Sequence, residues 1–495
     1  MLKRLASMLI LSSVTVFAND GVDSSSKIYS FEHGLRNPLL IKGKKNQYHS
    51  ISEEMMRYKI PGLSLALIIN GELRYVLNYG NSVESQPITN GTLFQAGSIA
   101  KVFNTIGALK LYQDGKVTLN NNVNDYLKSW NLEDNQFTQR NKVTIEELMS
   151  HTGGINVPGF SGIDRRITPL PTSIDALNGT KPYIVTPKVQ VVAEPGTRFS
   201  YSGGGMLILQ QIIEDQTGAN YTEWMKNNVL GPIGMKNSTF SQPLLNKYTE
   251  YAACGHDSNG NELTGCWHNY PEQGAAGLWT TSTDLSQALI ALIHAYYKES
   301  NALPINIDIA RKMFIEHKNY GIGLGVFVQS LDNIIEISHN GSVDGYKSSM
   351  TAFVNKDITS NSVKLKDGII ILTNGENGWN LYPEIIASFT ETFGIHAEKP
   401  IIITEVKPKK INLYTGKYIL TNDITSWSFK IIKKNAKLFC DYGQGVPQEL
   451  HFADKNLAYT LDGTKFTFVF DNKNKIDRLE ILLYEDSNIS HYKHL

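Results

Sequence analysis

A serine and a lysine three residues apart, at the start of an apolar segment, constrain this chain more than any other feature. After Ser98 and Lys101, apolar residues recur near the helical period as far as Asp114, and Gly115 stands at a C-terminal cap position. Residues i and i+3 share a helix face, so the Lys101 amine can reach the Ser98 hydroxyl. A serine becomes a good nucleophile when an adjacent base takes its proton. The stretch predicts a buried helix that begins near Ser98 and carries a candidate nucleophile and base.

The Ser-x-x-Lys spacing alone is not specific, because it also occurs at Ser24/Lys27 and at Ser490/Lys493. These two copies lie in a polar N-terminal tail and at the very end of the chain, where we expect no enclosed pocket. For the middle pair, the structural alternative is a helix-capping Ser98 with a solvated lysine. Other stretches must decide between the two interpretations.

A second candidate is Tyr201, which precedes a run of small residues at 202–205 and then an amphipathic helix. A tyrosine has an ordinary pKa near 10. It could move the serine proton only if a cation such as Lys101 lowered that pKa. The alternative is an interface aromatic beside a tight helix start.

A third candidate is His339, which follows a strand with alternating Ile335 and Ile337. Gly341 comes soon after it, and a glycine in a strand suits the close approach of a ligand to the backbone. A lone histidine is usually structural. Beside a glycine at a strand edge it is a candidate proton donor or substrate contact.

Composition and charge exclude some classes. A chain of 495 residues is long for one core, so we expect two or more domains. Lys+Arg and Asp+Glu both number 47, so nothing indicates binding to nucleic acid or to an anionic membrane surface.

The N-terminus has the pattern of a signal peptide. Lys3 and Arg4 precede an apolar stretch over residues 5–17 and a small-residue cleavage site after Ala18. We expect residues 1–18 to be removed and the mature protein to be periplasmic or secreted, with no membrane span. A retained anchor is the alternative, but the apolar run is shorter than the roughly 20 residues that cross a bilayer.

The next segments have simple patterns. Residues 19–45 are polar, and we predict an extended N-terminal extension. A short helix is expected from Ser50 to Tyr58, and a β-hairpin on the Asn70-Gly71 turn. Residues 155–197 predict a long irregular loop, and loops of this length are usually functional or mobile.

Cys254 and Cys266 each lie two residues before a histidine, His256 or His268. Two cysteines and two histidines could bind zinc tetrahedrally. In an exported protein a disulfide between the cysteines is the favoured interpretation, so no metal is predicted. Cys440 is then expected to be unpaired and buried.

The C-terminal part has a different sequence pattern from the rest of the chain. Residues 396–410 are rich in proline and lysine and predict a linker. Residues 411–495 contain about eight short alternating segments separated by turn residues, which predicts a small antiparallel barrel. This domain could be a lid or a substrate-selecting module, or a stabilising or oligomerising appendage.

The three candidate stretches together resemble a known family. Ser98-Ile-Ala-Lys101, Tyr201-Ser202-Gly203 and His339-Asn340-Gly341 are similar in order and rough spacing to the Ser-x-x-Lys, Tyr-x-Asn and Lys-Thr-Gly boxes of penicillin-recognising serine enzymes. The resemblance is best to the class C β-lactamase-like group, which includes D-Ala-D-Ala carboxypeptidases, D-aminopeptidases and esterases. It covers roughly residues 45–395 and includes residues 148–154, 230–235, 274–284 and 371–375. Residues 414–418 resemble the opening of the lipocalin-like domain that some members carry.

The resemblance implies a fold and a set of roles. Residues 46–395 would form an α+β domain, with an antiparallel sheet flanked by helices and a helical subdomain, followed by a C-terminal all-β lipocalin-like barrel. Ser98 would form an acyl-enzyme, and Lys101 and Tyr201 would together serve as general base and then as acid to the leaving group; the sequence does not tell which of the two is the base. The backbone N–H groups of Ser98 and Ser342 would form the oxyanion hole. His339 would stand where the family's lysine meets a substrate carboxylate or the leaving group.

Two departures from the family pattern bear on the substrate. Gly203 replaces the asparagine of the second box, so an amide that contacts the substrate is lost. His339 replaces lysine, so a positive charge there would depend on pH near 6.5. We therefore expect weak or no penicillin hydrolysis.

The favoured function is an exported serine hydrolase that acts without a cofactor on short peptides or amides, such as D-amino-acid-containing or cell-wall peptides. An esterase and a sensor that is acylated without turnover are the alternatives. No oligomeric state is predicted.

Overall fold

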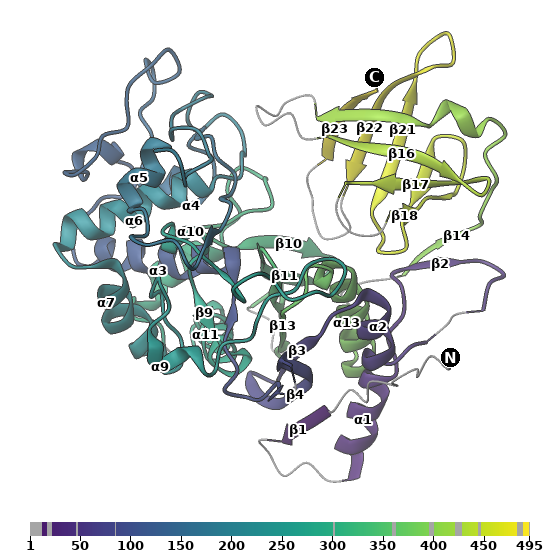
Figure 1. Cartoon of the computed structure of the whole chain (residues 1–495), viewed down its shortest axis with the longest axis horizontal. Helices are drawn as coiled ribbons and strands as arrows, with labels where there is room; N and C mark the ends of the chain where they lie inside the picture. Colours follow the sequence, from purple (N-terminus) through teal and green to yellow (C-terminus); the bar gives the residue numbers. More distant parts are fainter. Residues whose placement is uncertain are drawn as a thin grey trace.

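The computed structural model has an α+β body and an antiparallel barrel beside it (Figure 1). It describes residues 12–16, 22–45, 48–84, 86–299, 302–358, 363–395, 400–420, 428–443, 447–482 and 489–494. This α+β architecture with a C-terminal barrel confirms the fold class expected from the sequence.

An antiparallel sheet forms the centre of the body. In spatial order its strands are β1 (Ser12–Val16), β4 (Glu72–Val83), β3 (Gly62–Ile69), β13 (Lys366–Thr373), β12 (Tyr346–Asn355), β11 (Ile334–Val343) and β10 (Phe327–Leu331), and β5 (Gln86–Pro87) pairs with β4. β3 and β4 form the hairpin predicted at Asn70-Gly71.

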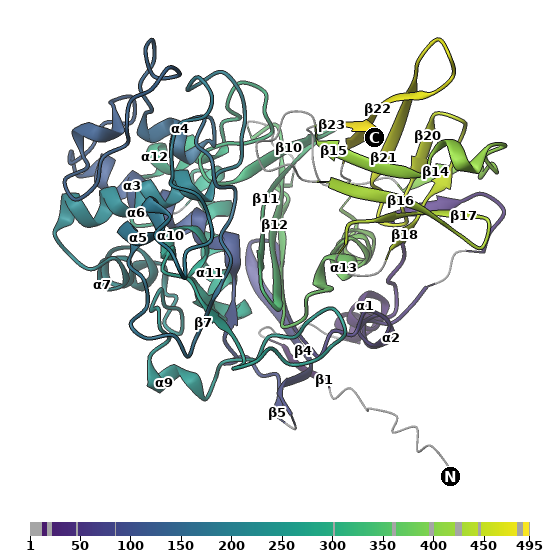
Figure 2. The ribbon, with the colours of Figure 1, turned by 45° about the horizontal axis from the view of Figure 1, so that its top comes forward.

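Strand alternation divides the apolar side chains of the sheet between two cores, because successive residues face opposite sides. On β3, Leu63, Leu65 and Leu67 belong to one core, whereas Ala66 and Ile68 belong to the other. Figure 2 shows the sheet nearly edge-on between its two helical layers. The core that includes Ala66 also holds Val102 after Ser98, Met206 after Tyr201 and Ile337 before His339, so the three candidate stretches lie on one side of the sheet.

The smaller layer consists of α1 (Val22–Glu32), α2 (Ile51–Tyr58) and α13 (Gly378–Phe393). The prediction that residues 19–45 are extended is wrong for α1. The sequence in this region is polar, but Phe31 is fully buried and its ring lies 6.5 Å from that of Phe389 on α13. Packing against α13 therefore stabilises a helix that the sequence pattern does not indicate.

The larger layer holds the helical subdomain. Its helices are α3 (Ala100–Gln113), α4 (Ile145–Met149), α5 (Ser173–Asn178), α6 (Gly203–Thr217), α7 (Tyr221–Met225), α8 (Gly231–Ile233), α9 (Asn246–Thr249), α10 (Gln273–Ala276), α11 (Ser282–Tyr296) and α12 (Ile307–Arg311). Asn104 on α3 donates to Met206 O at 2.9 Å, and Gln210 Oε1 accepts from Gly274 N at 2.8 Å. Buried hydrogen bonds thus tie α3 to α6 and α6 to α10.

Short strands join the subdomain to neighbouring loops. They are β6 (Phe94–Gln95), which pairs with β9 (Trp279–Thr280), and β7 (Ile163–Asp164), which pairs with β8 (His268–Asn269). β7 and α5 lie within the segment 155–197 that was predicted to be irregular, and most of that segment has no regular structure.

The C-terminal barrel is a nine-stranded antiparallel sheet that is nearly closed. Its strands are β18 (Gln448–Glu449), β17 (Lys437–Asp441), β16 (Ser428–Lys434), β15 (Gly416–Leu420), β23 (Ile489–His494), β22 (Ile476–Leu482), β21 (Lys465–Phe470), β20 (Leu457–Tyr459) and β19 (His451–Phe452). The two ends of this order, β18 and β19, are neighbours in sequence. Aromatic side chains such as Tyr418, Phe466 and Phe468 fill the interior.

The barrel is held by the linker and the N-terminal segment. β14 (Ile401–Ile403) pairs in parallel with β2 (Leu39–Ile41), and Leu39 N donates to Leu461 O at 3.2 Å. Gln448 also donates to Asn380 on α13 at 3.4 Å. Among the described residues, these contacts anchor the barrel beside the smaller helical layer.

The predicted signal segment includes β1, which pairs with residues 75–79 of β4 at the sheet edge. Residues 1–11 and 17–18 lie outside the described residues, and cleavage after Ala18 stays a prediction. No helix among the described residues is long and apolar enough to span a bilayer.

The structure joins Cys254 and Cys266 in a disulfide. The histidines of the zinc alternative point elsewhere, since Nδ1 of His256 lies 3.0 Å from Asn374 O and Nδ1 of His268 binds a carboxylate. The two-cysteine, two-histidine set is therefore not assembled. Cys440 is unpaired and buried, as expected.

Candidate active site

Ser98 lies on a 3₁₀ turn, η1 (Gly97–Ile99), that leads directly into α3. The surrounding turn is buried, but Ser98 itself is partly exposed. Gly97 has φ +51°, a backbone conformation that glycine adopts most readily. This turn presents the Ser98 hydroxyl at the start of the helix, where an incoming carbonyl could reach it.

Lys101 points from the first turn of α3 back to Ser98. Its Nζ donates to Ser98 Oγ at 2.9 Å and to Ala275 O on α10 at 2.7 Å. The side chain is 2% exposed, and burial lowers the pKa of Lys101 to about 7. The structural alternative of a solvated lysine is wrong. Near neutral pH the amine is available as a free base next to the serine.

Tyr201 lies just before α6, and its ring is next to Lys101. The Lys101 Nζ is 5.0 Å from the centre of the Tyr201 ring. Burial raises the pKa of Tyr201, and a hydrogen bond with Ser98 only partly opposes this shift. The phenol therefore stays protonated. Of these two residues, Lys101 is the one whose environment suits a base.

His151, in the loop after α4, contacts the ring of Tyr201 and binds the backbone on both sides of it. Its Nδ1 accepts from Ser202 N at 3.2 Å, its carbonyl accepts from Ser200 N at 2.8 Å, and its ring centre is 4.4 Å from that of Tyr201. Burial, followed by the nearby Lys101, lowers the pKa of His151 well below its usual value. No local pattern in the sequence indicates a site role for His151, because its contact with Tyr201 exists only after folding.

The stretch that includes His339 lies on β11, and the backbone of this strand comes close to the turn that carries Ser98. A Cβ at Gly341 would lie 2.0 Å from Ala96 O, and a Cβ at Gly97 would lie 2.7 Å from Ser342 N. Only glycines allow this close approach of the two backbones. The backbone N–H groups proposed for the oxyanion hole, those of Ser98 and Ser342, are thereby brought to neighbouring positions.

His339 lies two residues before Gly341 and faces the same side of β11, toward α3. Its ring centre is 6.3 Å from Tyr201 and 5.5 Å from Phe327 on β10. Nδ1 lies 2.7 Å from Asn340 O, a carbonyl that only accepts, so Nδ1 carries the proton. The Asn340 side chain falls on the opposite face of the strand, away from Ser98.

The expectation that His339 titrates near pH 6.5 is wrong. Burial, followed by the nearby Lys101, lowers its pKa to about 3, although the hydrogen bond to Asn340 opposes the shift. The side chain is 2% exposed, and Nε2 has no hydrogen-bond partner within the described part of the chain. His339 is therefore a neutral ring at physiological pH.

Gly203 is the first residue of α6, where the family pattern has asparagine. A Cβ at this position would lie 3.0 Å from Cε2 of Phe160 and 3.2 Å from Pro158 O. The loop over residues 155–197 therefore occupies the space beside Gly203. An aromatic ring, rather than an amide, stands next to this position.

A serine, a buried lysine in hydrogen-bond contact with it and a protonated tyrosine lie together here, and acyl-transfer hydrolases use groups of these kinds. The model of the β-lactamase family matches residues 49–382, more than half of the chain. The chain therefore belongs to the β-lactamase family, whose members include penicillin-binding-protein-like serine hydrolases.

Three comparisons illustrate this relationship. Protein flp from Staphylococcus aureus (strain MW2) is 27% identical over 222 residues, which cover 43% of this chain and 40% of that protein. The octameric penicillin-binding protein homologue from Pyrococcus abyssi has a TM-score of 0.57 at 20% identity, covering 90% of this chain and 98% of that one. A class C β-lactamase has a TM-score of 0.53 at 19% identity, covering 74% and 98%. These structural likenesses show the fold, and the flp match spans well under half of that relative.

Proposed function

We propose that the chain hydrolyses short peptides or amides, including ones with D-amino acids, through an acyl-enzyme on Ser98. The observation that carries this proposal is the 2.9 Å contact between Ser98 and a buried Lys101 whose pKa lies near 7. Most buried lysines are paired with an acid. Here the partners of the amine are a hydroxyl and a carbonyl.

In the first half-reaction Lys101 takes the proton of Ser98 while Oγ bonds to the substrate carbonyl carbon. The oxyanion that forms accepts hydrogen bonds from the backbone of Ser98 and Ser342. The bond from carbon to the leaving nitrogen then breaks, and that nitrogen takes a proton from Lys101, directly or through the protonated Tyr201. In the second half-reaction water attacks the acyl carbon and gives its proton to Lys101, and Ser98 regains a proton as it leaves.

The test is intact-mass measurement after incubation with a fluorophosphonate probe. The wild type should gain one label, whereas Ser98→Ala and Lys101→Ala should gain none. Lys110→Ala is a matched control, because Lys110 lies on the same helix and pairs with Asp114 at its far end. A folded wild type that takes no label would contradict the proposal.

Substrate profiling then separates the alternatives. Steady turnover of D-amino-acid peptide amides supports the favoured function. Turnover of small acyl esters alone would support an esterase. A burst of one product per protein followed by a negligible steady rate would support a sensor that is acylated without turnover.

We also propose that the protein is exported and that its domain boundaries lie at residues 18, 45, 395 and 410. Cleavage after Ala18 would remove β1 and leave residues 75–79 of β4 without this partner strand. N-terminal sequencing of the protein recovered from the native cell envelope or medium tests this directly. A chain that keeps residues 1–18 would contradict it.

A further inference from the structure

His151 binds the chain on both sides of Tyr201. The carbonyl of His151 accepts from Ser200 N at 2.8 Å, and its ring atom Nδ1 accepts from Ser202 N at 3.2 Å. Between these two points the imidazole lies against the phenol ring, with the ring centres 4.4 Å apart. One residue thus fixes the backbone before and after Tyr201 and also contacts its side chain.

The backbone of His151 has an unfavourable conformation. Its φ is +54°, in the left-handed region that few residues other than glycine adopt. Such strain persists where the surrounding structure fixes it, and it occurs often at active sites. Here the carbonyl and the ring nitrogen of the strained residue both bind the segment 200–202, so the strain coincides with the contacts that hold Tyr201.

The imidazole of His151 is held in one protonation state. The backbone N–H of Ser202 can only donate, so Nδ1 is the acceptor and the proton of the neutral ring lies on Nε2. The ring is 2% exposed, and burial, followed by the nearby Lys101, lowers the pKa of His151 well below its usual value. Nδ1 therefore keeps its lone pair when Lys101 takes up a proton, because that charge opposes a second charge on His151.

We propose that His151 is a positioning residue that aims the Tyr201 phenol at the leaving group of the substrate. This inference rests on the proposed hydrolase activity of Ser98. When the first intermediate collapses, the bond from the carbonyl carbon to the leaving nitrogen breaks and that nitrogen takes the phenol proton. Tyr201 in turn takes the proton that Lys101 received from Ser98, so both groups return to their starting states. This transfer requires the phenol to lie within hydrogen-bond distance of the leaving atom.

The experiment compares a leaving group that needs a proton with one that does not. The p-nitroanilide and the p-nitrophenyl ester of one N-acyl-D-alanine share their acyl group and differ in the leaving atom. The anilide nitrogen must gain a proton to leave, whereas p-nitrophenolate is a stable anion and leaves without one. The full-length protein is assayed with both substrates near pH 8. If the wild type cleaves only the ester, the methyl ester replaces the anilide, since methoxide also needs a proton to leave.

His151→Leu removes the acceptor for Ser202 N and keeps a buried side chain. It should lower kcat/KM about tenfold for the anilide and less than about threefold for the p-nitrophenyl ester, because only the anilide needs a well-placed phenol. His151→Asn is the rescue variant, since its Oδ1 can accept from Ser202 N and asparagine tolerates a left-handed backbone. It should keep the wild-type ratio of the two values. A folded His151→Leu variant with equal losses for both substrates, or with no loss, would overturn the inference.

Tyr201→Phe shows whether His151 acts through the phenol. This variant alone should lower kcat/KM selectively for the anilide. Adding His151→Leu should then leave the ratio of the two values unchanged, because residues that act as one unit are not additive. A second, independent loss in the double variant would contradict the positioning role. If His151→Leu does not fold, His151→Gly takes its place in both comparisons, because glycine accepts the left-handed backbone and also lacks the ring acceptor.

His317→Leu is the matched control. This histidine also lies beside α4, where its Nδ1 is 3.8 Å from Glu146 Oε1, and its loss should leave the ratio unchanged. Fluorophosphonate labelling separates the two levels of failure. An unlabelled wild type defeats the hydrolase proposal, whereas a labelled wild type in which His151→Leu lowers both kcat/KM values equally defeats only the inference about His151.

Discussion

Lys101 and Lys347 are two buried lysines on opposite sides of the central sheet, and each is 2% exposed. Lys101 binds a hydroxyl and a carbonyl. Lys347 binds the carboxylate of Glu376 at 2.6 Å. Burial lowers the pKa of both amines, but in Lys347 the charge of Glu376 opposes the shift. At equal burial, one lysine therefore has no acidic partner among its hydrogen bonds, and the other forms an ion pair.

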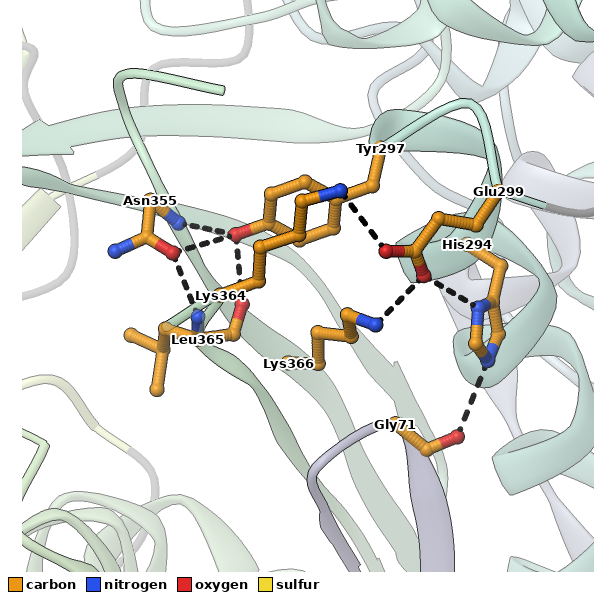
Figure 3. A network of polar contacts seen from close by, with 8 residues as sticks. All are labelled: Gly71, His294, Tyr297, Glu299, Asn355, Lys364, Leu365 and Lys366. Carbon is orange, nitrogen blue, oxygen red and sulfur yellow. Dashed lines mark hydrogen bonds and ion pairs between the residues drawn. The ribbon is translucent and has the colours of Figure 1, made fainter. Parts of the chain in front are cut away.

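Glu299 lies in a third, partly exposed group of polar residues (Figure 3). Here one acid is surrounded by several basic side chains, the opposite of a lysine without an acid. Glu299 binds Lys364 at 3.0 Å, Lys366 at 2.6 Å and His294 at 3.1 Å. Burial favours the neutral acid, but these hydrogen bonds outweigh it and lower the pKa of Glu299 to about 2. The three clusters differ in which partner is present, and this difference predicts which substitution affects activity and which affects stability.

Lys101→Met should have the largest effect. Loss of the general base should reduce kcat/KM by about 10³-fold, within the range for acid–base groups. The free energy of unfolding should stay the same or rise, because a buried amine without an acid is costly and methionine fills a similar volume. Kinetics and thermal unfolding of the same preparation check both parts. A variant that loses stability along with activity would show that Lys101 is structural.

Lys347→Met should have the reverse profile. Glu376 would lose its partner, and since its side chain is 28% exposed, the expected loss of stability is about 1–3 kcal/mol. Urea unfolding measures this loss. Labelling of Ser98 should remain detectable in the folded variant. Complete loss of labelling without loss of stability would contradict the prediction that Lys347 stabilises the fold and Lys101 serves the reaction.

The pH dependence of acylation should follow the free base of Lys101. Because its pKa is lowered to about 7, kcat/KM should reach a plateau above pH 8, be half-maximal near pH 7 and fall about tenfold per pH unit below pH 6. Neither His339 nor Tyr201 should add a step between pH 5 and 9, because the pKa of His339 is about 3 and that of Tyr201 is raised. A profile that stays flat down to pH 5 would rule out Lys101 as the base.

Glu299→Gln should have the smallest effect, about 1 kcal/mol of stability at pH 7, because the cluster is partly exposed and screened. A carboxylate with a lowered pKa stabilises the folded state above its unfolded pKa near 4.5, and this contribution is lost as the pH falls through about 2. The difference between variant and wild type should therefore shrink in acid. Chemical unfolding at pH 7 and pH 3 measures it, and activity should be unchanged.

Local patterns predicted much of the fold. Period-two alternation and the Asn70-Gly71 turn predicted the β3–β4 hairpin, and similar patterns placed the strands of the C-terminal barrel. The helix after Ser98 followed from its apolar period. α1 was missed because its stability comes from contacts such as Phe31 with Phe389, more than 350 residues away.

For the candidate site, the sequence alone determined that Ser98 and Lys101 are neighbours, because residues three apart meet on any helix. Tertiary structure decided what those neighbours are able to do. The pKa of Lys101 is lowered because distant segments bury it and offer it a carbonyl rather than an acid. His339 is neutral because Phe327 and Tyr201 enclose it. Desolvation and charge partners come from residues far apart in the chain, and no local pattern encodes them.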